Sequence, residues 1–238
     1  MFTKTAVLWT GGKDSALALY EAQRSGNDIH LLVTFAPPGF RFRAHPIALM
    51  AQQAEAMGIG HRVITIEEPI RDNYVAALGQ LAERDGIAVV VTGDISEVDG
   101  KPNWIRECSQ GLALDIQTPL WHRDREELLD RLITVGYKTL FTCVKAPWFT
   151  AEWVGRELDR AAVQAMRELR ITTGLDLCGE QGEYHTMVTD GPPFRHRIEI
   201  PAYSVRTDDG LAYLDVATVS AQRSVPEPGR AAPVRSGT

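Results

Sequence analysis

Hydrophobic positions in the first part of the chain follow two recurring patterns. Short apolar runs predict buried strands at residues 6–9, 30–35, 61–66 and 88–92. Between these runs, apolar residues recur at helical spacing and predict helices over residues 14–24, 46–57 and 71–84. Strands that alternate with helices favour an α/β fold, in which a parallel sheet carries helices on both faces.

The second part of the chain has a different pattern. Helices are predicted around residues 104–112, from Asp124 (with Glu127 placed for a capping box) and over about residues 152–169, and a strand over residues 138–144. Residues 174–194 are rich in glycine and proline, and residues 196–204 and 211–219 alternate like a β-hairpin that turns at residues 208–210. We therefore expect a first domain over residues 1–145, a smaller lobe over 146–220 and a disordered tail over 221–238.

Composition limits the class of protein and its partners. The 238 residues are 44% hydrophobic and 24% charged, as in ordinary globular proteins, and no apolar run approaches the roughly 18 residues of a membrane span. A strand is predicted close to the N-terminus, so we expect no signal peptide and no membrane partner. Cys108, Cys143 and Cys178 are far apart, which favours reduced thiols in the cytoplasm. The net charge of −6 argues against a nucleic-acid partner.

The first predicted turn carries the first candidate site. Residues 10–15 read Thr-Gly-Gly-Lys-Asp-Ser between a strand and a helix, so backbone N–H groups converge there as an anion site requires. The hydroxyls of Thr10 and Ser15 add donors, and Lys13 adds a positive charge. The spacing fails the Walker A motif, which needs serine or threonine directly after the lysine, where this chain has Asp14. The alternative interpretation is a plain glycine turn before an Asp-capped helix.

A second candidate site lies in the Gly-rich stretch over residues 178–192. Its carboxylates, Glu180, Glu183 and Asp190, stand among glycines, which let the backbone approach a ligand. Carboxylates can hold Mg²⁺ or bind an amine. The alternative is an ordinary loop with solvated acids.

Several stretches, in order along the chain, resemble one known family. Residues 10–15 resemble the PP-loop of enzymes that split ATP between its α- and β-phosphates and activate a substrate as its adenylate. Residues 178–192 are similar to the Gly-Glu-Gly-Gly-Glu-Tyr-Glu-Thr…Asp-Gly-Pro signature of the diphthine–ammonia ligase family, which also begins with a PP-loop. Residues 44–46, 53–59 and 119–129 resemble its histidine-proline segment, its Gln-Ala-Glu-Ala-Leu-Gly-Ile helix and its Pro-Leu-Trp-x-Arg-Asp-x-Glu-Glu-Leu-Leu segment.

The resemblance implies both an architecture and a reaction. It implies a Rossmann-like, HUP-type parallel sheet with helices on both faces, followed by a smaller C-terminal α+β lobe. The implied enzyme is an AMP-forming ligase that adenylates a carboxylate, releases pyrophosphate and amidates the adenylate with ammonia or ammonium. Its partners would be ATP with Mg²⁺ and a carboxylate-bearing acceptor, which is a small molecule or a modified protein histidine.

The resemblance also assigns roles by position. The residues that would hold the phosphates are Thr10, Gly11, Gly12, Lys13, Asp14 and Ser15. Those that would lie near adenosine are Thr34, Phe35 and Gly93. Those that would bind the acceptor are His45, Arg106, Glu107, Glu180, Glu183 and Thr186. The catalytic residues would be Lys13, Glu180 and Glu183, and the metal ligands stay open.

This chain departs from the family pattern where an acceptor would bind. Gln181 replaces the central glycine of the second signature, and His185 replaces its second glutamate. Residues 103–108 keep only an arginine and a glutamate of a longer family run. His45 and His185 are each interpreted equally well as site residues or as structural ones. Two other functions stay open, namely a tRNA-modifying sulfurtransferase and a non-enzymatic nucleotide-binding module.

Overall fold

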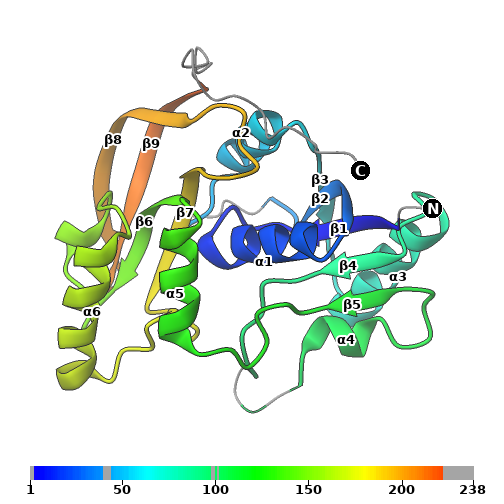
Figure 1. The fold of residues 1–238 in the computed structure, drawn as a ribbon, viewed down its shortest axis with the longest axis horizontal. Helices are drawn as coiled ribbons and strands as arrows, with labels where there is room; N and C mark the ends of the chain where they lie inside the picture. The colour runs from blue at the N-terminus through cyan, green and yellow to red at the C-terminus, as the bar shows by residue number, and fades with distance from the viewer. Residues whose placement is uncertain (1–2, 40–43, 98–99, 101, 222–238) are drawn as a thin grey trace, which may run out of the picture.

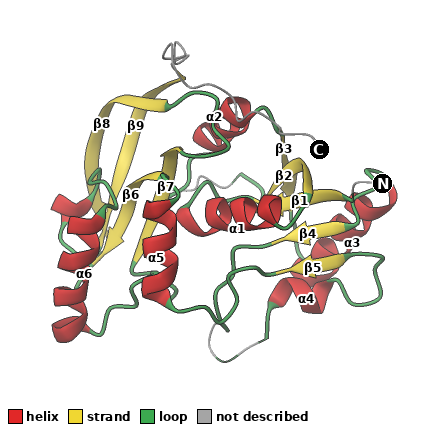
Figure 2. Ribbon diagram, viewed as in Figure 1, coloured by secondary structure: helices red, strands yellow, loops and turns green. Residues whose placement is uncertain are grey.

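Two β-sheets, shown side by side in Figure 1, form the framework of the molecule. The computed structural model describes residues 3–39, 44–97, 100 and 102–221, so the tail expected from residue 221 lies outside the described residues apart from its first residue. In Figure 1 the parallel sheet and its helices carry the colours of the first part of the chain, and Figure 2 shows the same helices and strands by type. Among the described helices, none combines the length and apolar character needed to cross a bilayer.

The first sheet has the strand order β3-β2-β1-β4-β5, and all of its strands run parallel. Its strands are β1 (Lys4–Leu8), β2 (Asp28–Ala36), β3 (Gly60–Thr65), β4 (Val89–Val91) and β5 (Asp115–Gln117). In the centre of this sheet, Val7 of β1 lies between Leu32 of β2 and Val91 of β4. This arrangement confirms the predicted Rossmann-like parallel sheet.

Helices cover both faces of this sheet, because its central strands are apolar on both sides. The helices are α1 (Lys13–Arg24), α2 (Ile47–Met57), α3 (Ile70–Glu83) and α4 (Trp104–Cys108). Val7 packs in one buried cluster with residues of α1 and α2, and its neighbour Ala6 packs in a second cluster with residues of α3 and α4. Successive residues of a strand point to opposite faces, which accounts for the two clusters.

The second sheet is antiparallel in its pairings and has the order β7-β6-β9-β8. Its strands are β6 (Lys138–Lys145), β7 (Tyr184–Asp190), β8 (Ile198–Asp208) and β9 (Leu211–Ala221). β8 and β9 form the predicted hairpin. At its turn Asp209 and Gly210 have φ values of 50° and 74°, as a two-residue turn with two positive φ angles requires.

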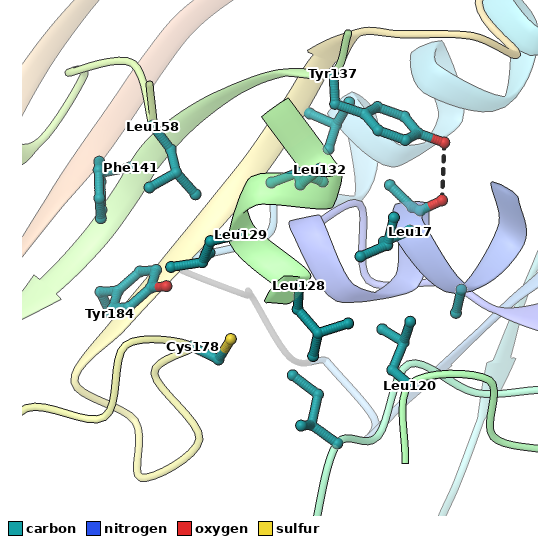
Figure 3. Close-up of a cluster of buried hydrophobic side chains, with 14 of the residues drawn as sticks. Leu17, Leu120, Leu128, Leu129, Leu132, Tyr137, Phe141, Leu158, Cys178 and Tyr184 are labelled. Atoms are coloured by element: carbon teal, nitrogen blue, oxygen red, sulfur yellow. Dashed lines mark hydrogen bonds between the residues drawn. The ribbon is translucent and has the colours of Figure 1, made fainter. Parts of the chain in front are cut away.

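The helix α5 (Arg125–Thr134) packs between the two sheets. Asp124 caps it by accepting hydrogen bonds from the backbone N–H groups of Glu126 and Glu127, where the sequence predicts its start. Figure 3 shows the leucines of α5 between Leu17 of α1 and Phe141 of β6, and all belong to one buried cluster. The two sheets therefore share a continuous core, so that a cavity between them has fixed walls.

The region between β6 and β7 differs from the prediction of one long helix over residues 152–169. The chain instead forms a short 3-10 helix, η1 (Ala151–Trp153), and then α6 (Arg160–Thr173). Gly155 separates them in a left-handed conformation with a φ of 83°, which a continuing helix cannot contain. Asp159 then starts α6 by accepting a hydrogen bond from the N–H of Ala162.

The strand pairing bears on where the two units divide. A boundary after residue 145 leaves β6 with the first unit, yet β6 pairs with β7 and β9 of the second sheet. No residue pairing joins β6 to the described strands of the parallel sheet. We propose that the division falls between β5 and α5.

Candidate active site

A cavity of about 1080 Å³ lies between the two sheets and has walls from both. From the first sheet it takes residues at the carboxyl ends of β1, β2 and β4, where parallel α/β sheets bind ligands. From the second it takes residues of the loop before β7, of β7 itself and Cys143 of β6. The volume is at the upper end of ordinary ligand pockets, about 300–1,000 Å³.

The loop over residues 10–15 forms one end of this cavity. Gly11 has a φ of 76°, and Gly12 is the N-cap of α1. Because glycine has no side chain to cap a helix, the cap residue leaves the first-turn donors open to a ligand, apart from the N–H of Lys13, which donates to Thr186. The hydroxyls of Thr10 and Ser15 lie 3.2 Å apart across the loop, and the Ser15 hydroxyl donates to Gly12 O at 3.1 Å. The loop has the form that a phosphate site requires.

The side chain of Lys13 reaches from this loop into the second lobe. Its Nζ donates to Asp14 Oδ2 at 2.7 Å and to the carbonyl oxygen of Cys178, and lies 5.1 Å from the centre of the Tyr184 ring. Burial disfavours the ammonium, but Asp14 and the other groups around it prevail and raise the pKa of Lys13. The residue therefore carries a positive charge in the cavity wall. Its ammonium has three N–H donors, and these two hydrogen bonds use two of them.

Strand β7 holds the loop from the other side. The backbone N–H of Lys13 donates to Thr186 Oγ1 at 3.1 Å, and the N–H of Val188 donates to Gly11 O at 2.9 Å. A Cβ on Gly12 would lie 3.1 Å from the carbonyl oxygen of Thr186, so only a glycine fits this contact well. Thr186, predicted to bind the acceptor, is thus a buried link between the loop and the second lobe.

Gln53 of α2 is a site residue that the sequence analysis did not single out. It is fully buried, and its Nε2 donates to Gly11 O at 2.9 Å and to Val188 O at 2.7 Å. Its Oε1 accepts from Trp9 Nε1 at 3.0 Å. The signal was present in the motif over residues 53–59, where a glutamine stands within the otherwise apolar buried face of α2. Gln53 fixes the loop against β7.

The predicted adenosine residues also line the cavity. The hydroxyl of Thr34 donates to Trp9 O at 2.7 Å, so it is already used within the sheet. The ring of Phe35 packs edge-on against Tyr74, with 4.8 Å between their centres, and both line the cavity. A Cβ on Gly93 would lie 2.8 Å from Ser15 N, so its glycine lets β4 approach the start of α1.

The two glutamates of the second signature lie in different surroundings. Glu180 lines the cavity, and burial, reinforced by Asp14, raises its pKa to about 7. Glu183 is 1% exposed and is not among the cavity residues. Its Oε1 accepts from Asp176 N at 3.0 Å and its Oε2 from Gln181 N at 2.9 Å. Glu183 therefore stabilises the conformation of its own loop, whereas Glu180 faces the cavity.

The other residues predicted to bind the acceptor substrate also differ in whether they line the cavity. His45 lines the cavity, as does His185, and their rings meet edge-on with 5.2 Å between their centres. Arg106 and Glu107 lie on α4 and are not among the cavity residues. Arg106 donates to Thr118 Oγ1 at 2.9 Å, and Glu107 lies 3.9 Å from Arg71. The structure brings the histidine into the site and leaves the arginine and the glutamate outside it.

Metal-binding capacity in the cavity is small. Within the described ranges, no group of three or more His, Cys, Asp or Glu residues could hold a metal ion. The cavity does contain two carboxylates, those of Asp14 and Glu180. Mg²⁺ is commonly held by one or two carboxylates together with substrate phosphates. This set fits such a shared site and not a closed metal centre.

Comparisons with known proteins agree with this arrangement. The model for the diphthamide synthase N-terminal domain matches residues 3–114, and that for the diphthamide synthase C-terminal domain matches residues 124–220. The diphthine–ammonia ligase of Danio rerio is 28% identical over 235 residues, covering 86% of this chain and 90% of that protein. That of Bos taurus is 25% identical over 244 residues, covering 90% and 89%.

A solved structure is similar at a lower level. It is described as a predicted subunit of a tRNA methyltransferase from Methanocaldococcus jannaschii, with a TM-score of 0.46, 16% identity and coverage of 80% of this chain and 100% of that one. At that score the likeness carries no argument. The two domain models match in sequence order and together span most of the chain, as the resemblance implied. The chain therefore belongs to the diphthamide synthase family, whose relatives include proteins named diphthine–ammonia ligase.

Proposed function

We propose that this protein is an ATP-dependent ligase that adenylates a carboxylate, releasing pyrophosphate, and then amidates it with ammonia, releasing AMP. The observation that carries the proposal is the single cavity lined both by the loop Gly12–Ser15 and by Glu180 and Thr186 of the second signature. Adenylation requires the acceptor carboxylate to contact the α-phosphorus of ATP, and residues far apart in sequence meet there. The names of the relatives support the same chemistry.

In this proposal the two lobes divide the work. The first-turn donors of α1, the hydroxyls of Thr10 and Ser15 and the ammonium of Lys13 bind the phosphates, because they converge at a helix N-terminus. Phe35 lies along the cavity from the loop and packs against adenosine. Glu180 faces the reacting groups from the second lobe. Asp14 and Glu180 would hold Mg²⁺ together with the triphosphate, where the ion would neutralise phosphate charge.

The acceptor is proposed to be diphthine, the modified histidine for which the relatives are named. A cavity of about 1080 Å³ is large enough for a nucleotide and an extended side chain together. His185 and Gln181 stand where the family signature has glutamate and glycine. The alternative acceptor is therefore a different carboxylic acid of similar length.

Cysteine chemistry bears on the alternative of sulfur transfer. Sulfur transfer needs a thiolate, but burial raises the pKa of Cys178, which lines the cavity, to about 12. A protonated, buried thiol is a poor nucleophile, so amide formation is favoured. No disulfide joins the three cysteines, all of which lie in the described part of the chain, and a reducing compartment such as the cytoplasm suits them.

The test is the nucleotide product formed with candidate acceptors. The protein is incubated with ATP, ammonium and either diphthine-bearing protein or a panel of carboxylic acids, and the adenine nucleotides are separated by ion-exchange chromatography. We expect AMP and pyrophosphate in amounts that depend on the acceptor. Accumulation of ADP, or AMP release that no acceptor increases, would contradict the proposal.

A further inference from the structure

Two histidines from different lobes meet at the cavity wall. His45 lies just before α2, and His185 lies on β7 beside Thr186, the residue that binds the backbone of Lys13. His45 Nε2 and His185 Nδ1 are 3.4 Å apart, and the rings are perpendicular, with an interplanar angle of 82°. Both side chains line the cavity, so their free ring edges are available to bound reactants.

The surroundings keep both rings uncharged at neutral pH. Burial, with contributions from His185 and Lys13, lowers the pKa of His45 to about 3. Partial burial in the cavity and the charge of Lys13 also lower the pKa of His185. A neutral imidazole has one N–H donor and one bare nitrogen acceptor. In a hydrogen bond between two such rings, the tautomer of one ring therefore determines the tautomer of the other.

The position of His45 determines the tautomers of both rings once a nucleotide is bound. His45 Nδ1 is buried without a hydrogen-bond partner among the described residues, the backbone of Thr10 favours a proton on this ring, and Cε1, which joins the two ring nitrogens, would lie 3.3 Å from a Cβ on Gly12. This edge of the ring therefore faces the loop over residues 10–15, called the phosphate loop below. An anion bound there would favour the tautomer with its proton on Nδ1. His45 Nε2 is then the acceptor of the hydrogen bond from His185 Nδ1–H. His185 Nε2 is left as a bare acceptor on the cavity side.

The second half of the proposed reaction needs such an acceptor. Ammonia attacks the carbonyl carbon of the acyl-adenylate, forming a C–N bond and a positively charged nitrogen. One proton must leave that nitrogen as the carbonyl reforms and the C–O bond to AMP breaks. Ammonium, the main form at neutral pH, has no lone pair, so a base beside the attacking nitrogen also supplies the ammonia that attacks. A positioned base commonly contributes about 10²–10⁴-fold to such a step.

We propose that His185 is the base of the amidation step, taking the proton from the attacking nitrogen on Nε2 while His45 holds its ring in the required tautomer. This inference rests on the proposed function and deepens it. The family signature has glutamate at this position, and histidine and glutamate share the ability to accept a proton. His185 is therefore a catalytic residue, and His45 is a positioning residue that also contacts phosphate.

The test separates the two half-reactions in the full-length protein. Acceptor-dependent exchange of pyrophosphate into ATP measures adenylation, and product formation from ammonia or from hydroxylamine measures transfer. The conjugate acid of hydroxylamine is a much stronger acid than ammonium, so hydroxylamine is largely the free base at neutral pH and needs no base to become nucleophilic. We expect His185→Gln to keep exchange within a few-fold, to lose about 100-fold or more of transfer to ammonia, and to retain most transfer to hydroxylamine.

Two further variants sharpen the outcome. His185→Glu should regain much of the transfer to ammonia, because a carboxylate can also take the proton. His30→Gln makes the same change on an exposed histidine outside the cavity and should match the wild type in every assay. Equal losses with ammonia and hydroxylamine in His185→Gln, or unchanged transfer to ammonia, would overturn the inference. Absence of exchange in the wild type would instead refute the proposed function.

Discussion

Replacement of Gln53 by leucine tests whether the phosphate loop depends on the second lobe. The amide of Gln53 makes three buried hydrogen bonds, to Gly11 O, to Val188 O and from Trp9 Nε1. Leucine has a similar size and fills the space, but it can make none of them. Gly11 O keeps its bond from Val188 N, whereas Val188 O and Trp9 Nε1 lose the partner that the structure gives them.

The expected cost follows from those two groups. Within a strand the N–H and C=O of one residue point to the same side, so Val188 O faces Gln53 and not the neighbouring strand β6. A buried polar group left without a partner costs about 1–3 kcal/mol, so the two groups together lower the free energy of unfolding by roughly 2–6 kcal/mol. For a chain of this length that corresponds to a fall of roughly 5–20 °C in Tm.

Thermal unfolding followed by circular dichroism measures this change, and calorimetry measures ATP affinity on the same preparation. The matched control is Gln80→Leu, which makes the same substitution on the exposed side of α3 and should stay within about 0.5 kcal/mol of the wild type. ATP affinity should fall in Gln53→Leu alone, because the loop loses the bridge from Gly11 O to Val188 O, one of its contacts with β7. A Tm of Gln53→Leu equal to that of the control would show that the loop is held by other means.

Three further outcomes are expected. Lys13→Ala should weaken ATP binding by roughly 10- to 100-fold in calorimetry, since a charge-assisted hydrogen bond contributes about 1.5–3 kcal/mol; unchanged affinity would exclude its phosphate role. Glu183→Gln should lower Tm because an amide cannot accept from both Asp176 N and Gln181 N, whereas Glu180→Gln should raise Tm at neutral pH and lose turnover; the reverse would exchange their roles. The folded-state pKa of Glu180, about 7, is above the ordinary 4.5, so this group makes the wild type less stable as pH rises between those values. In denaturant titrations Glu180→Gln should flatten that decline, and an identical slope would mean that the carboxyl is not buried.

Much of the framework could be predicted because hydrophobic spacing reports local structure directly. The parallel strands have apolar residues on both faces, and the hairpin has a turn at Asp209 and Gly210 that requires positive φ angles. The prediction of one helix over residues 152–169 was wrong, because the helical spacing was given more weight than Gly155 and the Asp159 cap. β7 was missed because its sequence was interpreted through the glycines before it, although its residues are largely buried.

The site was predictable where chemistry depends on adjacent residues and not where it depends on folding. The loop over residues 10–15 and Glu180 line the cavity, as spacing and motif indicated. Glu183 looks identical to Glu180 in the sequence, and only the folded loop shows that both of its oxygens accept backbone N–H groups. Gln53 stands in a motif that the sequence displays, but its role could not be assigned because its partners are 42 and 135 residues away.

The contacts between the lobes explain why the second signature belongs with the phosphate loop. Lys13 N binds Thr186, Gly11 O binds Val188 N, and Lys13 Nζ binds Cys178 O, so the loop has hydrogen bonds to residues on both sides of Glu180. A helix N-terminus alone would bind any anion. Because the same strand that contacts the loop also carries His185, the proposed phosphate and acceptor sites share one piece of backbone.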